Sequence, residues 1–306
     1  MLQAPAIAFQ FRPSTRRQEP VDVVRSTIER ADDELDYAEA KLAFDAVVDP
    51  SIDKSAVLSE LGRLTKEARD LAGQSRDADA KLKGLRRVIY ESGSWNSFRP
   101  FEYDQSDPLG RVMRNKLLHN YLATRRGQCV SMPVLMLILA DRLGLPMSLA
   151  TAPDHVLVRY QLSDCRAVNL ETTSGAHPAR EIWYRKNFPI TDLSLETGIY
   201  LRSLTRREAV AVMAMIVVEH LYKAGRHEEV MAVTVILLQH HPLDVNVILT
   251  RGSAAGKLLN ELRQRFPHPG LAPPEVIARL QQLMGQNIAA FATAENLGWI
   301  PFEENH

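Results

Sequence analysis

The apolar stretch from Leu135 to Leu143 constrains the fold most, because a segment without a polar face must be buried on all sides. Gly144 follows it, and glycine commonly ends a helix. Upstream, Pro133 has no N–H, and its ring would clash with the carbonyl four residues earlier. A helix that contains Pro133 therefore begins at or just after Cys129. We expect a buried helix with Cys129 at its N-terminus, where free N–H groups and the helix dipole favour a thiolate.

The residue pattern changes from helical to alternating between residues 147 and 173, which predicts two antiparallel strands. His155 begins the first strand and Glu171 ends the second. A turn centred on Ser163 would pair residues whose numbers sum to 326, and so would place His155 directly opposite Glu171, with Cβ atoms roughly 5 Å apart. A slip of one residue would move Glu171 to the other face of the sheet.

Cys129, His155 and Glu171 match the needs of thiol acyl transfer, which are a thiolate, an imidazole within reach and a group that orients the imidazole. A free cysteine alone is more often a small buried apolar residue. The histidine and the carboxylate downstream make the catalytic interpretation the stronger one. Asn169 shares a strand face with Glu171 and competes for the orienting role. Glu171 is preferred because the expected register puts it opposite His155. A carboxylate also stabilises the imidazolium.

The oxyanion of such a reaction would need hydrogen-bond donors near the thiol. The backbone N–H of Cys129 is the expected donor, and Gln128 and Asn115 are further candidates. Cys165 lies in the predicted turn without such neighbours and is interpreted as an incidental thiol. No group of side chains has the spacing of metal ligands, so neither a metal nor a cofactor is expected.

Composition narrows the range of partners. Lys+Arg and Asp+Glu each number 37, and this balance argues against nucleic-acid binding. Two cysteines cannot form a disulfide framework, so we expect a reduced, cytoplasmic protein. The segment before Pro20 does not resemble a signal peptide, and the longest apolar run, Ala209–Val218, is too short to span a bilayer. A membrane is not an expected partner either.

Periodicity divides the chain into four predicted regions. Helical patterns include one from Val21 to Phe44 and, after residue 204, two helices separated by Gly225 that resemble a tetratricopeptide hairpin. A weaker second hairpin is predicted from Asp244 to Phe266, before a last helix that begins at Pro274. The regions are an irregular arm (1–20), a helical N-terminal region (21–110) that ends in a long irregular loop, an α+β core (111–204) and a helical tail (205–306).

Several motifs resemble the transglutaminase-like superfamily, a papain-related cysteine-triad fold, and most closely its SirB-type bacterial branch. They are Asn115 to Leu118, Leu122 to Gly127, Leu143-Gly144-Leu145 and Pro153-Asp154-His155. The resemblance implies that the helix bearing the cysteine packs on a small antiparallel sheet. It also implies acyl transfer from an amide of a protein or peptide substrate to water or an amine, as in a peptidase or a transglutaminase-like enzyme.

Two alternatives remain open beside catalysis. Many SirB-type members carry Pro where this chain has Cys129, so a catalytically silent scaffold that binds a protein partner through its tail is the second hypothesis. A redox-sensing thiol is a third. The superfamily usually has Asp where this chain has Glu171, which bears on the geometry of the third catalytic group.

Overall fold

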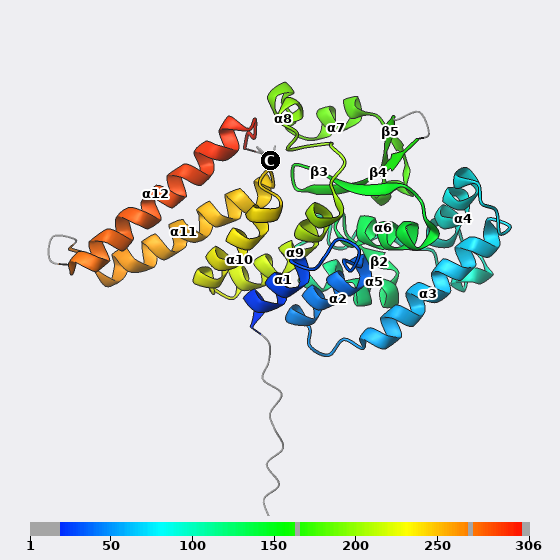
Figure 1. Cartoon of the computed structure of the whole chain (residues 1–306), viewed down its shortest axis with the longest axis horizontal. Helices are drawn as coiled ribbons and strands as arrows, with labels where there is room; N and C mark the ends of the chain where they lie inside the picture. The colour runs from blue at the N-terminus through cyan, green and yellow to red at the C-terminus, as the bar shows by residue number, and fades with distance from the viewer. Residues whose placement is uncertain (1–18, 163–165, 269–271, 302–306) are drawn as a thin grey trace, which may run out of the picture.

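The computed structural model describes residues 19–162, 166–268 and 272–301, and it shows a small antiparallel sheet surrounded by helices (Figure 1). The predicted α+β class is confirmed. Four helices precede the core: α1 (Pro20–Ile28), α2 (Tyr37–Val48), α3 (Lys54–Leu71) and α4 (Ala78–Tyr90). Residues 1–18 of the predicted arm lie outside the described residues.

The prediction of one helix from Val21 to Phe44 is wrong, because α1 ends at Ile28 and α2 begins at Tyr37. The Asp36 carboxylate accepts a hydrogen bond from the N–H of Glu39, which caps a new helix. The apolar spacing runs through the break and therefore hides it. The start of α2 is marked by its capping residue, Asp36, and not by a change in the apolar spacing.

The segment between α4 and the next long helix consists of short pieces. They are 3-10 turns at Ser94–Asn96 and Met113–Lys116, strand β1 (Glu102–Tyr103), helix α5 (Leu118–Thr124) and strand β2 (Arg126–Gly127). The parallel pairing of β1 with β2 brings the 92–110 loop beside the start of the core helix. Between Arg111 and Thr124, the chain forms only a 3-10 turn and the short α5.

Helix α6 (Ser131–Leu143) is the buried centre of the molecule. All of its residues except Asp141 and Arg142 are buried. Pro133 lies in its first turn, where the missing N–H leaves no hydrogen bond unmade. Gly144 ends the helix with a φ of 66°, in the left-handed region that glycine adopts at low cost. The predicted start and stop of this helix are confirmed.

Four antiparallel strands in the order β3-β4-β5-β6 pack on α6. They are β3 (Met147–Ala152), β4 (His155–Gln161), β5 (Ala167–Glu171) and β6 (His177–Ala179). Val158 pairs with Leu170, so paired numbers sum to 328 and not to 326 as expected. The predicted turn residue, Ser163, lies in the undescribed segment 163–165.

The tail adds four helices after the short α7 (Glu181–Asn187) and α8 (Asp192–Glu196). They are α9 (Arg206–Lys223), α10 (His227–His240), α11 (Val245–Arg265) and α12 (Pro274–Asn296). The hairpin predicted from Asp244 to Phe266 is wrong, because this segment is one continuous helix that pairs with α12. Figure 1 shows α11 and α12 extending together away from the sheet.

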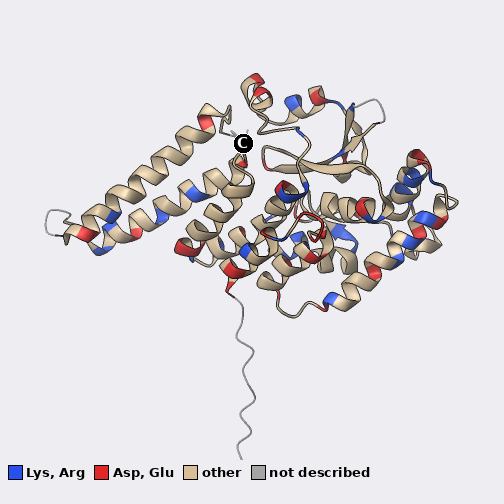
Figure 2. Cartoon of the chain, viewed as in Figure 1, with Lys and Arg blue, Asp and Glu red and all other residues tan. Residues whose placement is uncertain are grey.

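Helix α9 is not peripheral to the core, because most of its length is buried against α2, α10 and β3. One apolar core runs from the N-terminal helices through α6 to α9, α10 and α11. Charged residues of both signs are distributed along the helices of the described chain (Figure 2). None of the described helices combines the length and the apolar character needed to cross a membrane.

Candidate active site

Cys129 lies in a turn between β2 and α6, and α6 begins at Ser131. Its side chain is half-buried, and its Sγ donates to the backbone carbonyl of Asp154 at 3.8 Å. The turn is fixed because the N–H of Gln128 donates to Ser131 Oγ at 2.9 Å, and that hydroxyl donates to the carbonyl of Asn115 at 3.0 Å. The thiol is therefore presented by an immobilised turn at the start of the buried helix.

His155 reaches the thiol because a two-residue turn joins β3 to β4. Ala152 pairs with His155, which leaves only Pro153 and Asp154 in the turn. Asp154 has a φ of 50°, a left-handed conformation that Asp tolerates better than most residues. The turn thus places the imidazole at the first position of β4 and aims the Asp154 carbonyl at the sulfur.

Glu171 contacts His155 diagonally and not directly across the sheet, so the expected pairing of these two residues is wrong. If the observed register continued by one residue, Leu157 would stand opposite Glu171. The shift from the expected register is two residues, which keeps every side chain on its face. His155 Nε2 and Glu171 Oε2 lie 2.8 Å apart. A diagonal neighbour is more distant than a direct one, and the long Glu side chain spans that gap.

The Glu171 carboxylate has further donors besides His155. Oε2 also accepts from Tyr184 Oη at 3.1 Å, while Oε1 accepts from the N–H and the hydroxyl of Thr173 at 3.1 and 2.6 Å. Phe188 stacks on the imidazole with ring centroids 5.2 Å apart. The imidazole and its carboxylate are therefore held in place from several sides.

Sequence reasoning missed Tyr184, Phe188 and Thr173. Thr173 carried a usable signal, since a threonine two residues after a carboxylate often closes a local turn. The two aromatic residues come from α7, and nothing local in the sequence connects them to the sheet.

The charge states of the pair follow from these contacts. Burial alone would lower the pKa of His155, but the hydrogen bonds that the imidazole makes to Cys129 and Glu171, together with their negative charges, outweigh it and raise the pKa to about 9. Burial likewise opposes ionisation of Glu171, yet hydrogen bonds from His155 and Thr173 hold its pKa below the usual value. The pair is thus an imidazolium and a carboxylate at neutral pH.

Gln128 and Asn115, the other oxyanion candidates, use their amide donors elsewhere. Gln128 Nε2 donates to the carbonyls of Asp107 at 2.8 Å and Asp104 at 3.4 Å. Asn115 Nδ2 donates to the carboxylates of the same two residues at 3.1 and 2.9 Å. All four acceptors are oxygens that cannot donate, so the orientation of both amides is fixed. Both side chains anchor the 104–107 loop beside Cys129.

Asn169, the competing partner of the imidazole, is buried on β5 opposite Arg159. Its Oδ1 has no hydrogen-bond partner within the described residues. The imidazole instead contacts Glu171. Among the two orienting candidates, the structure brings only Glu171 to His155.

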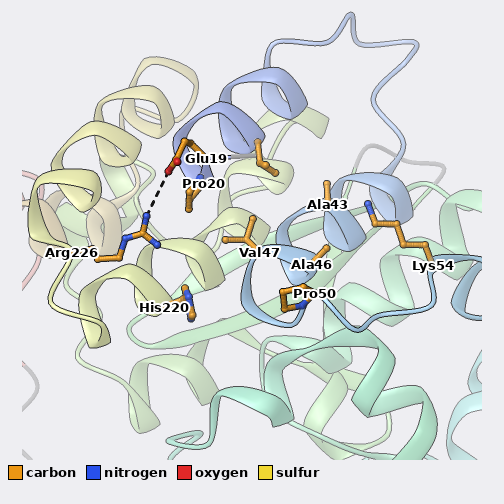
Figure 3. A pocket seen from close by; sticks show the side chains of 10 residues that line it. Glu19, Pro20, Ala43, Ala46, Val47, Pro50, Lys54, His220 and Arg226 are labelled. Atoms are coloured by element: carbon orange, nitrogen blue, oxygen red, sulfur yellow. Dashed lines mark ion pairs between the residues drawn. The ribbon is translucent and has the colours of Figure 1, made fainter. Parts of the chain in front are cut away.

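A cleft of about 770 Å³ opens at the sulfur. Cys129, Val130, His155 and Phe188 line it together with residues of α9 and α11. A separate cavity of about 490 Å³ lies among α1, α2 and the α9–α10 turn, where Glu19 and Arg226 form an ion pair of 3.8 Å (Figure 3). The two cavities share no lining residue, so the second is not part of this site.

Across residues 19–162, 166–268 and 272–301, no group of three or more His, Cys, Asp or Glu side chains could hold a metal ion.

Residues 55–181 match the protein family described as the transglutaminase-like superfamily. This range begins in α3 and so includes part of the predicted N-terminal region. A UPF0162 protein of Vibrio cholerae is 27% identical over 143 residues, which are 47% of this chain and 50% of that protein. The chain thus spans about half the length of this relative.

Two further relatives match longer stretches. A UPF0162 protein of Buchnera aphidicola is 24% identical over 224 residues, covering 71% of this chain and 78% of its own length. Protein SirB1 of Salmonella typhimurium is 24% identical over 200 residues, with shares of 64% and 70%. No solved structure matches this chain. Residues 55–181 therefore form a transglutaminase-like domain, within a chain that is similar to the UPF0162 and SirB1 proteins.

Proposed function

We propose that this protein catalyses cysteine-dependent acyl transfer from an amide, with Cys129 as nucleophile, His155 as acid and base, and Glu171 as the orienting group. The observation that carries the proposal is the His155–Glu171 contact of 2.8 Å beside a half-buried thiol in a cleft. Nε2 faces a carboxylate and must carry a proton, so Nδ1 is the ring nitrogen left for the sulfur. A structural histidine would not need a second nitrogen directed at a thiol.

In the proposed reaction the Cys129 thiolate attacks the amide carbonyl carbon. The resulting oxyanion is stabilised by the backbone N–H of Cys129, which has no hydrogen-bond partner within the described residues. His155 transfers its Nδ1 proton to the departing amine, and the C–N bond breaks to leave a thioester. The neutral imidazole then removes a proton from water or an acceptor amine, which attacks the thioester and releases the thiol.

The test is a peptide library made by tryptic digestion of a cell lysate, incubated with the protein and a primary amine. Mass spectrometry would show new peptide termini, deamidated side chains or amine adducts, and Cys129→Ala is the matched control. We expect at least one of these products to require Cys129. If wild type and Cys129→Ala gave the same products, the enzymatic proposal would fail.

The competing proposal is a silent scaffold that binds a protein partner through its tail. Exposed apolar side chains on α12 favour it: Met284 is 43% exposed and Ile288 is 60% exposed. Complementation of a deletion strain separates the two proposals. A folded Cys129→Ala protein that restores function fully, alongside a Met284→Glu/Ile288→Glu protein that does not, would favour the scaffold.

A further inference from the structure

Two helices of the tail line the cleft that contains Cys129. Helix α9 contributes Val212, Met215, Glu219, Tyr222 and Lys223, and helix α11 contributes Asn246, Leu249, Thr250 and Ser253. The four α11 positions follow the spacing i, i+3, i+4 and i+7, which places them on one face of the helix. A single stripe of α11 therefore borders the space in front of the thiol.

Other faces of α11 are fixed by close packing. A Cβ at Gly252 would come within 2.8 Å of the Ala290 side chain, so only glycine allows this approach to α12. Asn287 Nδ2 donates to the carbonyl of Gly252 at 2.8 Å. Arg251 Nη1 donates to the carbonyl of Met231 on α10 at 2.8 Å. The orientation of the stripe is therefore set by α10 and α12.

The stripe combines apolar and hydrogen-bonding groups. Leu249 and Met215 are partly buried beside Val212, and they supply an apolar surface. The side chains of Asn246 and Ser253 have no hydrogen-bond partners within the part of the chain that the structure describes. These two side chains flank Leu249 along the helix and are available to a ligand.

Outside Cys129 and His155, the formal charges that line the cleft balance, because Arg111, Lys116 and Lys223 are matched by Asp154, Glu219 and Asp244. Glu219 Oε2 lies 2.7 Å from Lys116 Nζ, and Glu219 Oε1 lies 2.8 Å from Lys223 Nζ. The α9 and α11 residues that line the cleft are called the α9–α11 wall. Its partly exposed charges are paired and so give little preference for a charged ligand. The wall thus favours a ligand that offers apolar surface together with neutral hydrogen-bonding groups, which is the chemistry of a polypeptide backbone with apolar side chains.

We propose that the α9–α11 wall is the specificity site of this cleft and binds a peptide segment of the substrate next to the amide that reaches Cys129. An apolar side chain packs on Leu249 and Met215, and backbone amides bond to Asn246 and Ser253. The proposal rests on the proposed function and adds the substrate class: an extended polypeptide with an apolar residue near the reacting amide. The cleft volume lies within the range of about 300–1,000 Å³ for ligand sites, so a segment of a few residues fills it.

The test compares two electrophiles on Cys129 in a Cys165→Ala background. Iodoacetamide is too small to reach the wall, whereas acetyl-tripeptidyl chloromethyl ketones with Leu, Gly, Glu or Lys at one varied position reach it. The readout is the ratio of the peptidyl to the iodoacetamide rate constant. We expect the Leu probe to give the highest ratio. Leu249→Ala should lower its ratio about tenfold, the effect of about 1.4 kcal/mol of lost binding.

The double variant Asn246→Ala/Ser253→Ala should lower the ratios of all four probes together, because backbone contacts do not depend on the side chain. Val235→Ala is the matched control, an apolar tail residue that is 42% exposed and outside the cleft. The proposal would be overturned if Leu249→Ala and Asn246→Ala/Ser253→Ala both gave the same ratios as Val235→Ala. It would also be overturned if the wild-type protein gave the same ratio for all four probes. The alkylation ratios do not depend on amide turnover. Peptide binding at the α9–α11 wall and acyl transfer by Cys129 are therefore tested separately.

Discussion

The Lys41–Asp45 pair on α2 and the His155–Glu171 pair on the sheet are both buried charge pairs, but only the second borders a cleft. Lys41 and Asp45 lie 2.6 Å apart with neither side chain exposed. His155 and Glu171 lie 2.8 Å apart and are 9% and 3% exposed. Lys41 also donates to the carbonyl of Lys116 at 3.1 Å, whereas the second nitrogen of His155 is directed at a thiol.

The comparison shows that burial of charge does not by itself identify a functional site. Burial raises the pKa of Asp45 against the opposing effect of Lys41, and Asp45 Oδ2 accepts from the N–H of Leu118 at 2.8 Å. The Lys41–Asp45 pair, called the sealed pair because neither side chain is exposed, therefore holds α2 against the start of α5. What distinguishes the pair on the sheet is that the second nitrogen of His155 meets a thiol that lines an open cleft.

The largest expected effect on turnover follows the removal of Cys129, the proposed nucleophile. Cys129→Ala should reduce amide turnover by about 10⁴-fold or more, because the covalent route is lost. The fold should persist, since a half-buried small side chain in a turn is replaced by a smaller one. Turnover and the thermal midpoint are the measurements. Retained turnover at a tenth of the wild-type rate would contradict the role of the thiol.

Glu171→Gln should come next, with a loss of about 10³-fold in turnover. The amide can accept the His155 bond but cannot stabilise the imidazolium. Glu171→Asp is the sharper variant, because it keeps the charge and shortens a side chain that reaches His155 diagonally. We expect Asp to perform no better than Gln. Near-normal turnover with Asp would mean that the diagonal geometry is unimportant.

At the sealed pair, Lys41→Met should lower the free energy of unfolding by about 3–5 kcal/mol, because it leaves the buried Asp45 carboxylate without its cation. The kcat of the folded fraction should stay unchanged, which is the opposite of the Cys129→Ala result. Urea unfolding and kinetics at low temperature measure the two quantities. A fall in kcat without a loss of stability would place Lys41 in the chemistry and remove the contrast between the pairs.

Between neutral and alkaline pH, stability should also depend on the protonation of His155. Its pKa is about 9 in the folded protein and 6.5 when unperturbed. Protonation therefore favours the folded state: the stabilisation is complete below pH 6.5, declines between 6.5 and 9, and is lost above 9. The decline should be about 3 kcal/mol, at 1.36 kcal/mol per pKa unit.

The measurement is the free energy of unfolding across this range for wild type and His155→Gln, which lacks the titrating group. The difference between the two proteins should shrink as the pH rises. A difference that stays constant from neutral pH to above 9 would show that His155 is not protonated at neutral pH in the folded protein.

Much of the site follows from local chemistry in the sequence. Pro133 and Gly144 define the ends of α6 through the N–H that proline lacks and the conformation that glycine allows. Strand alternation has a period of two, so an error of two residues in the register left His155 and Glu171 on one face. These predictions needed no knowledge of distant contacts.

The rest depends on packing between segments that are far apart in the sequence. Tyr184 and Phe188 reach the triad from α7, and Leu249 reaches the cleft from α11, although no local pattern marks any of them. Gln128 was an oxyanion candidate because it precedes Cys129 in the sequence, but its amide donates to carbonyls of the 104–107 loop. Such orientations emerge only from the assembled fold.

The smallest predicted effect concerns Asp154, whose carbonyl faces the sulfur while its exposed side chain lies at the cleft. Asp154→Gly should leave turnover within about twofold and stability within about 1 kcal/mol, since glycine adopts its φ of 50° freely but adds chain entropy to the unfolded state. Asp154→Val should destabilise more, because a β-branched residue is disfavoured there. If Asp154→Gly instead lost more than tenfold in turnover while folded, the carboxylate would itself take part in the chemistry. The cleft would then hold a second acid beside the proposed triad. The contrast with the sealed Lys41–Asp45 pair would depend on that acid as well as on the His155 nitrogen that faces the thiol.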